Sequence, residues 1–192
     1  IHDARHQMTS VIPEGKMTPQ QLTDFNRHQT ELMRSLATDP GNPATRVHLD
    51  NAIGVLSGMD IDDKAKDQAI AGFLDGFLAT SQAVVKETQR LQTQTAAAGT
   101  EVTQPAPAKA LYSTLAASPN PLIQGVAVKG FAANKDDKAV MATATRAIAN
   151  GNVDPEIRLL RGQSAERLGD TELANADALK TLRAQPGNAP AK

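Results

Sequence analysis

Histidines are the first residues in this chain whose spacing could do chemistry. Two histidines four residues apart on a helix can share a zinc ion, with an acid between them as the base. His2 and His6 have that spacing, with Asp3 between them. The other two, His28 and His48, fall in separate stretches with helical periodicity, each one turn from apolar positions. We interpret the first pair as incidental and the second as boundary histidines, which would meet if their two helices formed a hairpin.

Carboxylates and a serine supply two further candidates for a site. Asp60, Asp62 and Asp63 resemble the opening of a calcium loop, but the glycine and the closing glutamate are missing, which favours helix capping. The stretch GQSAERLG from Gly162 is no nucleophile elbow, because its serine lacks the flanking glycine and a preceding strand. We therefore expect a protein without enzymatic activity, cofactor or metal. An enzyme whose site the sequence does not reveal is kept as an alternative, beside the two functions given below.

Composition narrows the class of protein. The 192 residues carry 20 basic and 21 acidic side chains, which are mixed along the chain and give a formal charge of −1. This balance argues against nucleic acid as a partner, and no apolar run reaches the roughly 20 residues of a membrane helix. There is no cysteine, and the first residue is Ile1. With the Ala, Thr, Asn and Gln content, these features favour a periplasmic or membrane-tethered part of a bacterial envelope protein over a cytoplasmic one.

Apolar periodicity predicts an all-α fold. Aromatic residues make up 3% of the chain, and no stretch alternates with the two-residue period of a half-buried strand. Thr18, Pro19 and Gln21 form a capping-box start, and Gly58 ends the second helix. The predicted helices cover residues from Pro19 to the turn at 39–43, about 43–57, 62–91, 107–117, 121–133, 136–150, 155–168 and 171–184.

The same pattern predicts how the chain is organised. A loose arm covers residues 1–16, and a three-helix half follows at 17–95. Low hydrophobicity together with Pro105 and Pro107 indicates a linker or long loop at 96–106. A second helical half covers 107–188, with a tail at 189–192.

The second half contains an internal repeat with an offset of 34 residues. Helix starts, the internal turn and the small-residue face fall in register between the two copies. The aligned pairs are Pro121 with Pro155, Ile123 with Ile157, Val126 with Leu160, Asp136 with Asp170, Ala142 with Ala176, and Ala144 with Ala178.

The later copy resembles the tetratricopeptide repeat family. Gly162 stands where that family has a small residue between its two helices, Gly169-Asp170 stands at the tight turn, Ala174 opens the second helix and Pro186 closes the unit. The earlier copy departs from the pattern, with Val128 and Lys135-Asp136 in the glycine positions. The resemblance implies antiparallel helical hairpins stacked as a short α-solenoid. The first half is then either a helical bundle or a set of degenerate repeats.

These features predict a non-catalytic protein–protein interaction module, a scaffold or assembly factor that binds a peptide or helix of a partner in a helical groove. Five polar residues on the first helices of the repeats are the candidate partner-binding residues: Gln124, Lys129, Arg158, Arg161 and Gln163. The two arginines would clamp an acidic or C-terminal carboxylate. In the alternative reading, the chain is a structural component of an envelope or secretion machine that forms homo-oligomers through the long helix at 62–91.

Overall fold

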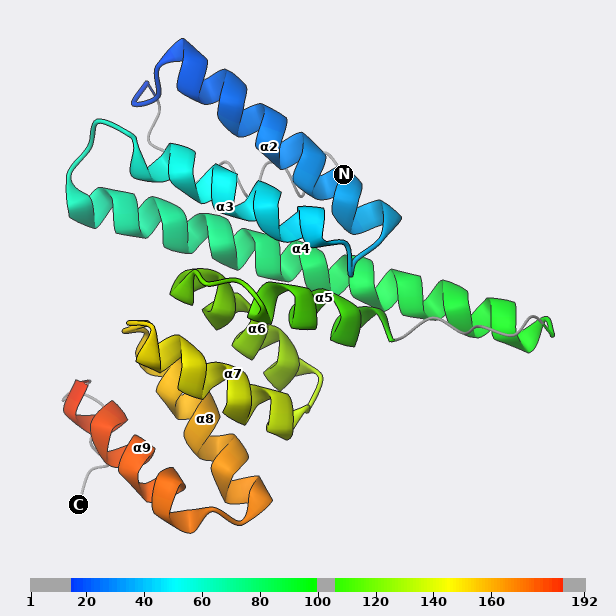
Figure 1. The fold of residues 1–192 in the computed structure, drawn as a ribbon, viewed down its shortest axis with the longest axis vertical. Helices are drawn as coiled ribbons and strands as arrows, with labels where there is room; N and C mark the ends of the chain where they lie inside the picture. Colours follow the sequence, from blue (N-terminus) through cyan, green and yellow to red (C-terminus); the bar gives the residue numbers. More distant parts are fainter. Residues whose placement is uncertain (1–14, 100–105, 185–192) are drawn as a thin grey trace. The chain divides into compact units, whose positions relative to one another are not determined.

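The computed structural model describes residues 15–99 and 106–184, and every regular element within them is an α-helix, which confirms the predicted class for that part of the chain (Figure 1). The helices are α2 (Pro19–Thr38), α3 (Pro43–Ser57), α4 (Asp63–Ala97), α5 (Pro107–Ala116), α6 (Pro121–Ala133), α7 (Asp137–Ala149), α8 (Pro155–Leu168) and α9 (Thr171–Ala184). The chain divides into two compact units, 1–114 and 115–192. The division falls within α5.

Parts of the predicted organisation lie outside the described residues. They include most of the arm at 1–16 with His2 and His6, most of the linker at 96–106, Pro186 and the tail at 189–192. Where the predicted linker is described, α4 continues past Leu91 as far as Ala97. In the part of the chain that is described, no helix is both long enough and apolar enough to cross a bilayer.

The helix starts of the first unit follow from local side-chain chemistry. The hydroxyl of Thr18 accepts a hydrogen bond from the Gln21 backbone N–H at 3.1 Å, and the Gln21 side chain accepts one from the Thr18 N–H at 2.9 Å. This reciprocal pair is the predicted capping box. Asp62 accepts a hydrogen bond from the Ala65 N–H at 2.9 Å and caps α4. The acidic cluster at 60–63 therefore starts a helix there.

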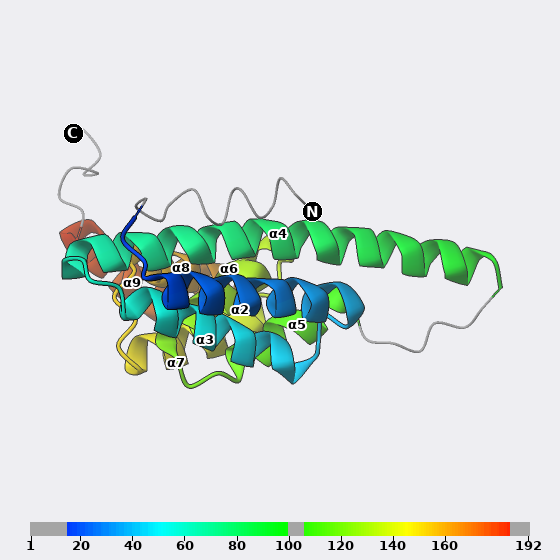
Figure 2. The same ribbon diagram turned by 90° about the horizontal axis from the view of Figure 1, so that it is seen from above.

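The core of the first unit is formed by one face each of α2, α3 and α4, which lie side by side (Figures 1 and 2). The rings of Phe25 and Phe73 meet edge to face with their centroids 5.4 Å apart, and both are fully buried. Two apolar residues of α2 and α3, Leu22 and Val47, are each 49% exposed. Leu22 precedes the buried stripe that begins at Phe25, and Val47 lies about 200° around α3 from buried Leu49.

The second unit consists of two helical hairpins, α6–α7 and α8–α9. Each helix packs on the next, and α8 also packs on α6. Helix α6 is buried around most of its circumference, and its Ile123, Val126 and Phe131 form the centre of the unit. Helix α9 differs, because Asp177 is its only buried residue within the described part of the chain. The unit therefore covers its first helix and leaves most of its last helix in solvent.

The predicted 34-residue offset is confirmed for the helix starts and extends to their caps. Helices α6 and α8 begin at Pro121 and Pro155, and α7 and α9 begin at Asp137 and Thr171. N-cap side chains at equivalent positions accept hydrogen bonds from equivalent backbone N–H groups. In the first helix of each hairpin the donor lies two residues after the cap, and in the second helix it lies three residues after the cap. The four pairs are Asn120 with Leu122, Asp154 with Glu156, Asp136 with Ala139, and Asp170 with Leu173.

The turns inside the hairpins also match, although their residues differ. Gly169 has a φ of 86° and Lys135 has a φ of 57°, so both adopt the left-handed conformation that usually requires glycine. In each turn the following aspartate donates its N–H to a carbonyl five residues back, Asp136 to Phe131 at 3.0 Å and Asp170 to Ala165 at 2.8 Å. Lys135 thus forms the same helix end as Gly169 without the glycine.

Candidate functional site

Gln124, the first candidate partner-binding residue, lies inside the second unit and is 1% exposed. Its amide nitrogen donates a hydrogen bond to the Ser118 carbonyl at 2.7 Å, and its amide oxygen accepts one from the Asn150 side chain at 3.2 Å. Both ends of the amide are therefore occupied within the protein. Gln124 joins the start of α6 to the end of α7.

Arg161 is also buried, and it pairs with a carboxylate of the neighbouring helix. Its Nε and Nη2 donate hydrogen bonds to the two carboxylate oxygens of Asp177 at 2.6 and 2.7 Å, and its Nη1 donates to the Thr145 hydroxyl at 3.3 Å. The Asp177 side chain is 1% exposed. This bidentate pair ties α8 to α9, with a further contact to α7. Arg161 therefore holds α8 and α9 together, and it is not among the residues that line the groove between them.

Lys129 forms a bridge from α6 to the start of α8. Its Nζ lies 3.1 Å from an Asp154 carboxylate oxygen and 2.8 Å from a Glu156 carboxylate oxygen. Burial alone lowers the pKa of Lys129, but the hydrogen bonds with Glu156 and Asp154 outweigh it, and the pKa lies above its ordinary value. Lys129 is thus held charged between the two hairpins.

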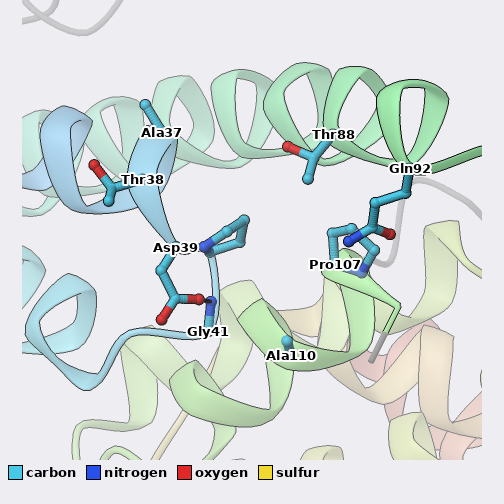
Figure 3. Close-up of a pocket in the computed structure, with 9 residues that line it drawn as sticks. Ala37, Thr38, Asp39, Gly41, Thr88, Gln92, Pro107 and Ala110 are labelled. Carbon is cyan, nitrogen blue, oxygen red and sulfur yellow. Dashed lines mark hydrogen bonds between the residues drawn. The ribbon is translucent and has the colours of Figure 1, made fainter. Parts of the chain in front are cut away.

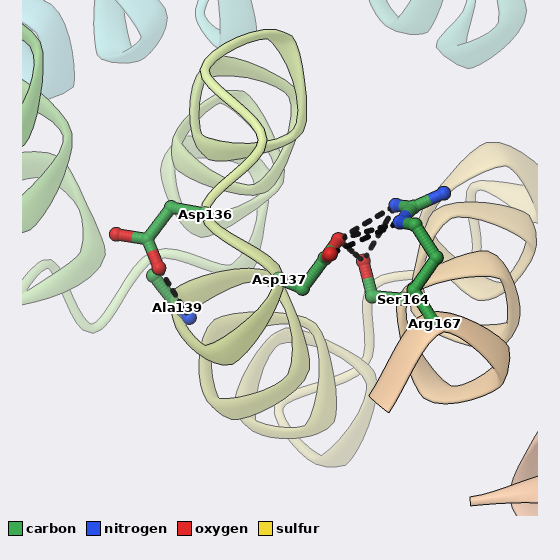
Figure 4. A network of polar contacts seen from close by, with 5 residues as sticks. All are labelled: Asp136, Asp137, Ala139, Ser164 and Arg167. Atoms are coloured by element: carbon green, nitrogen blue, oxygen red, sulfur yellow. Dashed lines mark hydrogen bonds and ion pairs between the residues drawn. The ribbon is translucent and has the colours of Figure 1, made fainter. Parts of the chain in front are cut away.

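A second ionic contact joins the hairpins at the other end of α8. Arg167 donates to the Asp137 carboxylate with a shortest distance of 2.7 Å, and the Ser164 hydroxyl donates to the same carboxylate at 2.8 Å (Figure 4). The hydrogen bonds from Arg167 and then Ser164 lower the pKa of Asp137. Lys129 and Asp137 therefore hold opposite ends of α8 against the α6–α7 hairpin.

Arg158 and Gln163 are the candidates that keep their polar groups available. Arg158 is half-buried and Gln163 is exposed, and neither side chain has a hydrogen-bond or ion-pair partner within the described residues. Both lie on α8, where Gln163 lines a groove, whereas Arg158 lies four residues before Gly162 and is not part of the lining. The five candidates therefore separate into two available residues and three that hold the hairpins together.

The groove lies between α8 and α9 and has a volume of about 260 Å³. Small residues line its centre, namely Gly162, Ala174 and Ala178. A Cβ added at Gly162 would lie 3.2 Å from the Asp177 Cβ and 3.6 Å from the Ala174 carbonyl, so α8 and α9 are close together there. The predicted small residue at Gly162 thus has its expected reason, which is the close approach of α8 and α9. The lining residues are Leu159, Gly162, Gln163, Glu166, Thr171, Ala174, Asn175 and Ala178.

The first unit has a larger open pocket of about 580 Å³. Figure 3 shows Thr88 and Gln92 of α4 beside it, together with the α2–α3 turn at Asp39 and Gly41 and with Pro107 of α5. Gly41 allows a close approach there, because a Cβ at this position would lie 3.0 Å from the Ala110 Cβ. The charged side chain in this lining is Asp39, whose carboxylate already accepts a hydrogen bond from the Gly41 N–H at 3.1 Å. Nothing in the lining selects a particular ligand.

The hairpin of α2 and α3 brings His28 and His48 together, as the sequence predicts for that arrangement. Their ring centroids are 6.1 Å apart, and the Nδ1 atoms of both rings are buried without a hydrogen-bond partner. Burial, followed by the charges of Arg27 and His48, lowers the pKa of His28, against the opposing effect of Asp24. Among residues 15–99 and 106–184, no cluster of three or more His, Cys, Asp or Glu side chains is arranged to hold a metal ion.

Asp177 is the important residue that sequence reasoning missed. It stands among alanines on α9 and carries no motif of its own. The signal available in the sequence was the position of Arg161. It stands next to Gly162, and the small residue at Gly162 predicts close contact with α9. An aspartate on the facing helix could then be read as the partner of the arginine.

Comparisons of this chain with protein-family models, curated proteins and solved structures find no match. The resemblance to tetratricopeptide repeats therefore rests on the residues quoted above and on the 34-residue register of helices, caps and turns.

Proposed function

We propose that this chain is a non-catalytic protein–protein interaction module, a scaffold or assembly factor that binds a peptide or helix of a partner protein. The observation that supports it best is the open groove between α8 and α9, floored by Gly162, Ala174 and Ala178. Backbones can approach closely over such small side chains, and Gln163 of the lining has no side-chain partner within the described residues. Arg158, also without a partner there, lies on the same helix four residues before Gly162.

Part of this proposal is that the two hairpins of the second unit are tetratricopeptide-like repeats of a short α-solenoid. The equivalent caps and the left-handed turns at Lys135 and Gly169 support this assignment. Solenoid repeats contact mainly their neighbours and present extended surfaces to partners. The function follows from that architecture together with the open groove.

The experiment that tests the function is affinity capture from a lysate of the source organism with the whole chain as bait. Arg158→Glu reverses the charge of an α8 arginine that has no ion-pair partner within the described residues, and Arg146→Glu is the matched control on exposed α7 surface. Loss of a specific partner in the first variant and its retention in the second supports the proposal. Retention in both removes Arg158 as a clamp for an acidic or C-terminal carboxylate, and capture of nothing by any form counts against the binding function.

A second candidate function is self-assembly through α4, as a structural component of an envelope or secretion machine. The observation that favours it is that the buried residues of α4 end at Val85, while Leu91 is 49% exposed. Light scattering over a dilution series of the chain and of Leu91→Glu tests it. Oligomers that dissociate in the variant support self-assembly, and a monomer at every concentration excludes it.

A further inference from the structure

We propose that the α8/α9 groove receives an α-helix of the partner, lying parallel to α8 and carrying basic side chains in its last turn. This inference rests on the proposed function and adds the conformation, direction and charge of what is bound.

The equivalent groove in the same unit already holds a helix. Shifted back by 34 residues, each residue that lines the α8/α9 groove falls on a residue of α6 or α7. The equivalents are Gly125, Val128, Lys129, Ala132, Asp137, Val140, Met141 and Ala144. Helix α8 packs against both α6 and α7.

Contacts of α8 fall on three of these equivalents. A Cβ added at Gly125 would lie 3.5 Å from Ile157 Cδ1. Lys129 pairs with Glu156, and Asp137 pairs with Arg167. The start of α8 therefore lies against α6 and its end lies at the start of α7. The residues that take these positions in the open groove are Leu159, Gln163 and Thr171.

Burial shows what the open groove lacks. Val140 and Ala144 of α7 are fully buried. Their equivalents on α9 are half-buried Ala174 and exposed Ala178. The same small-residue face is thus covered on α7 and open on α9. A helix placed on α9 as α8 is placed on α7 would bury it, and helices approach most closely over such residues.

Charge and size determine which helix fits. Glu166 lines the groove, and Glu172 lies in the first turn of α9. On the preceding hairpin, the first turn of α7 contacts a basic residue of the helix packed on it, because Asp137 pairs with Arg167 of α8. Both glutamates are exposed and have no ion-pair partner within the described residues. A helix parallel to α8 brings its last turn to them, so basic side chains there are favoured. Leu159 replaces Gly125, and it requires a small residue near the start of the bound helix.

The probe is a stapled peptide with the sequence of α8, Pro155 to Leu168, changed at two positions. Ile157→Ala and Arg161→Leu fit it to Leu159 and Leu179, which take the places of Gly125 and Thr145. A second peptide adds Arg167→Glu and reverses the charge of the last turn. Binding to the full chain is measured by fluorescence anisotropy.

Two variants of the chain test whether the peptide binds in the α8/α9 groove. Ala178→Glu places a charge on the groove floor, whereas Ala176→Glu places one on an exposed position whose equivalent, Ala142, is also exposed. We expect at least about tenfold weaker binding of the first peptide in Ala178→Glu and no change in Ala176→Glu. Equal binding by both variants, or no binding of the peptide to the unmodified chain, overturns the inference.

A charge swap tests whether the bound helix runs parallel to α8. The Arg167→Glu peptide should bind about fivefold or more weakly than its parent, and Glu166→Lys in the chain should restore it. If the reversed peptide binds the unmodified chain as tightly as its parent, the inference is overturned. A native partner that is captured through Arg158 but bound as an extended segment also overturns it, while leaving the proposed function in place.

Discussion

Arg161 and Asp177 face each other across the α8–α9 hairpin, joined by two hydrogen bonds of 2.6 and 2.7 Å in a setting almost free of solvent. The Cβ of Asp177 also lies 3.2 Å from where a Cβ at Gly162 would stand. Asp177 thus takes part in both the buried ion pair, through its carboxylate, and the close contact of the two helices, through its Cβ. Arg161 is for this reason unsuited to a binding test, because its removal is expected to destabilise the hairpin.

The first prediction concerns this buried pair. Arg161→Ala leaves the Asp177 carboxylate buried without its partner, so the second unit should lose about 3–5 kcal/mol of stability. Urea unfolding followed by circular dichroism measures the loss. The double variant Arg161→Leu with Asp177→Leu should recover much of it, because it removes both buried charges. A single variant as stable as the unmodified chain would contradict the structural role of the pair.

The second prediction uses the left-handed turn residues. Lys135→Gly should stabilise the protein by about 0.5–1 kcal/mol, because glycine adopts a positive φ without the steric cost that lysine has there. The exposed lysine side chain has no hydrogen bond or ion pair within the described residues. Gly169→Ala is the matched control and should destabilise by about 1 kcal/mol. Thermal unfolding of the three proteins checks both signs, and a lower midpoint for Lys135→Gly refutes the first.

The third prediction compares two helical glycines. Gly162→Ala forces a methyl group against the Asp177 Cβ at 3.2 Å and should destabilise by about 1–2 kcal/mol. A Cβ at Gly54 in α3 meets no atom within 4 Å, so Gly54→Ala should stabilise by about 0.5–1 kcal/mol through helix propensity. Chemical denaturation of both variants measures the difference. A stabilising effect of Gly162→Ala would contradict the role of close packing at this position.

The fourth prediction is a pH dependence of the first unit. The pKa of His28 in the folded protein lies below its ordinary value of 6.5, mainly because of burial and then because of Arg27 and His48. The unfolded chain therefore binds the proton more readily, and stability should fall as the pH drops through 6.5 toward the folded pKa. Unfolding midpoints at pH 7.5 and pH 5.5 measure this loss.

The control for this prediction is His28→Gln, which removes the titrating ring. Its stability should change less between the two pH values than that of the unmodified chain. Unfolding should be followed at Tyr112, whose side chain lies in the first unit, 3.2 Å from the Ser81 hydroxyl. Equal pH dependence in both proteins would assign the effect to other groups.

Helix positions could be predicted because the signals that start and stop helices are local. Thr18, Asp62 and Asp136 each cap the helix that follows, and the prolines at 43, 121 and 155 begin helices. The meeting of His28 and His48 was predictable in the same way, since a short turn between two helices brings their facing sides together. Local rules thus account for the element boundaries and for one long-range contact.

Whether each candidate residue is buried and paired or exposed could not be predicted, because this depends on partners distant in sequence. The buried amide of Gln124 is satisfied by hydrogen bonds with Ser118 and Asn150, and the buried guanidinium of Arg161 is satisfied by its pair with Asp177. A polar residue on the first helix of a hairpin has the same local pattern whether it faces solvent or a buried carboxylate. The identity of the facing residue decides between them, and it appears only once the helices are paired.

The ionic joint between the two hairpins has a consequence for the order in which the second unit opens. Lys129 and Arg167 hold α8 to the α6–α7 hairpin at its two ends, and the Arg167 side chain is 52% exposed. Added salt weakens such contacts, while the mostly apolar interior of α6 is little affected. Amide hydrogens of α8 and α9 should therefore exchange together, earlier than those of α6, and increasingly early as ionic strength rises. The hairpin that offers the open groove would then also be the least firmly attached part of its unit, so that an occupant would raise its protection against exchange most of all.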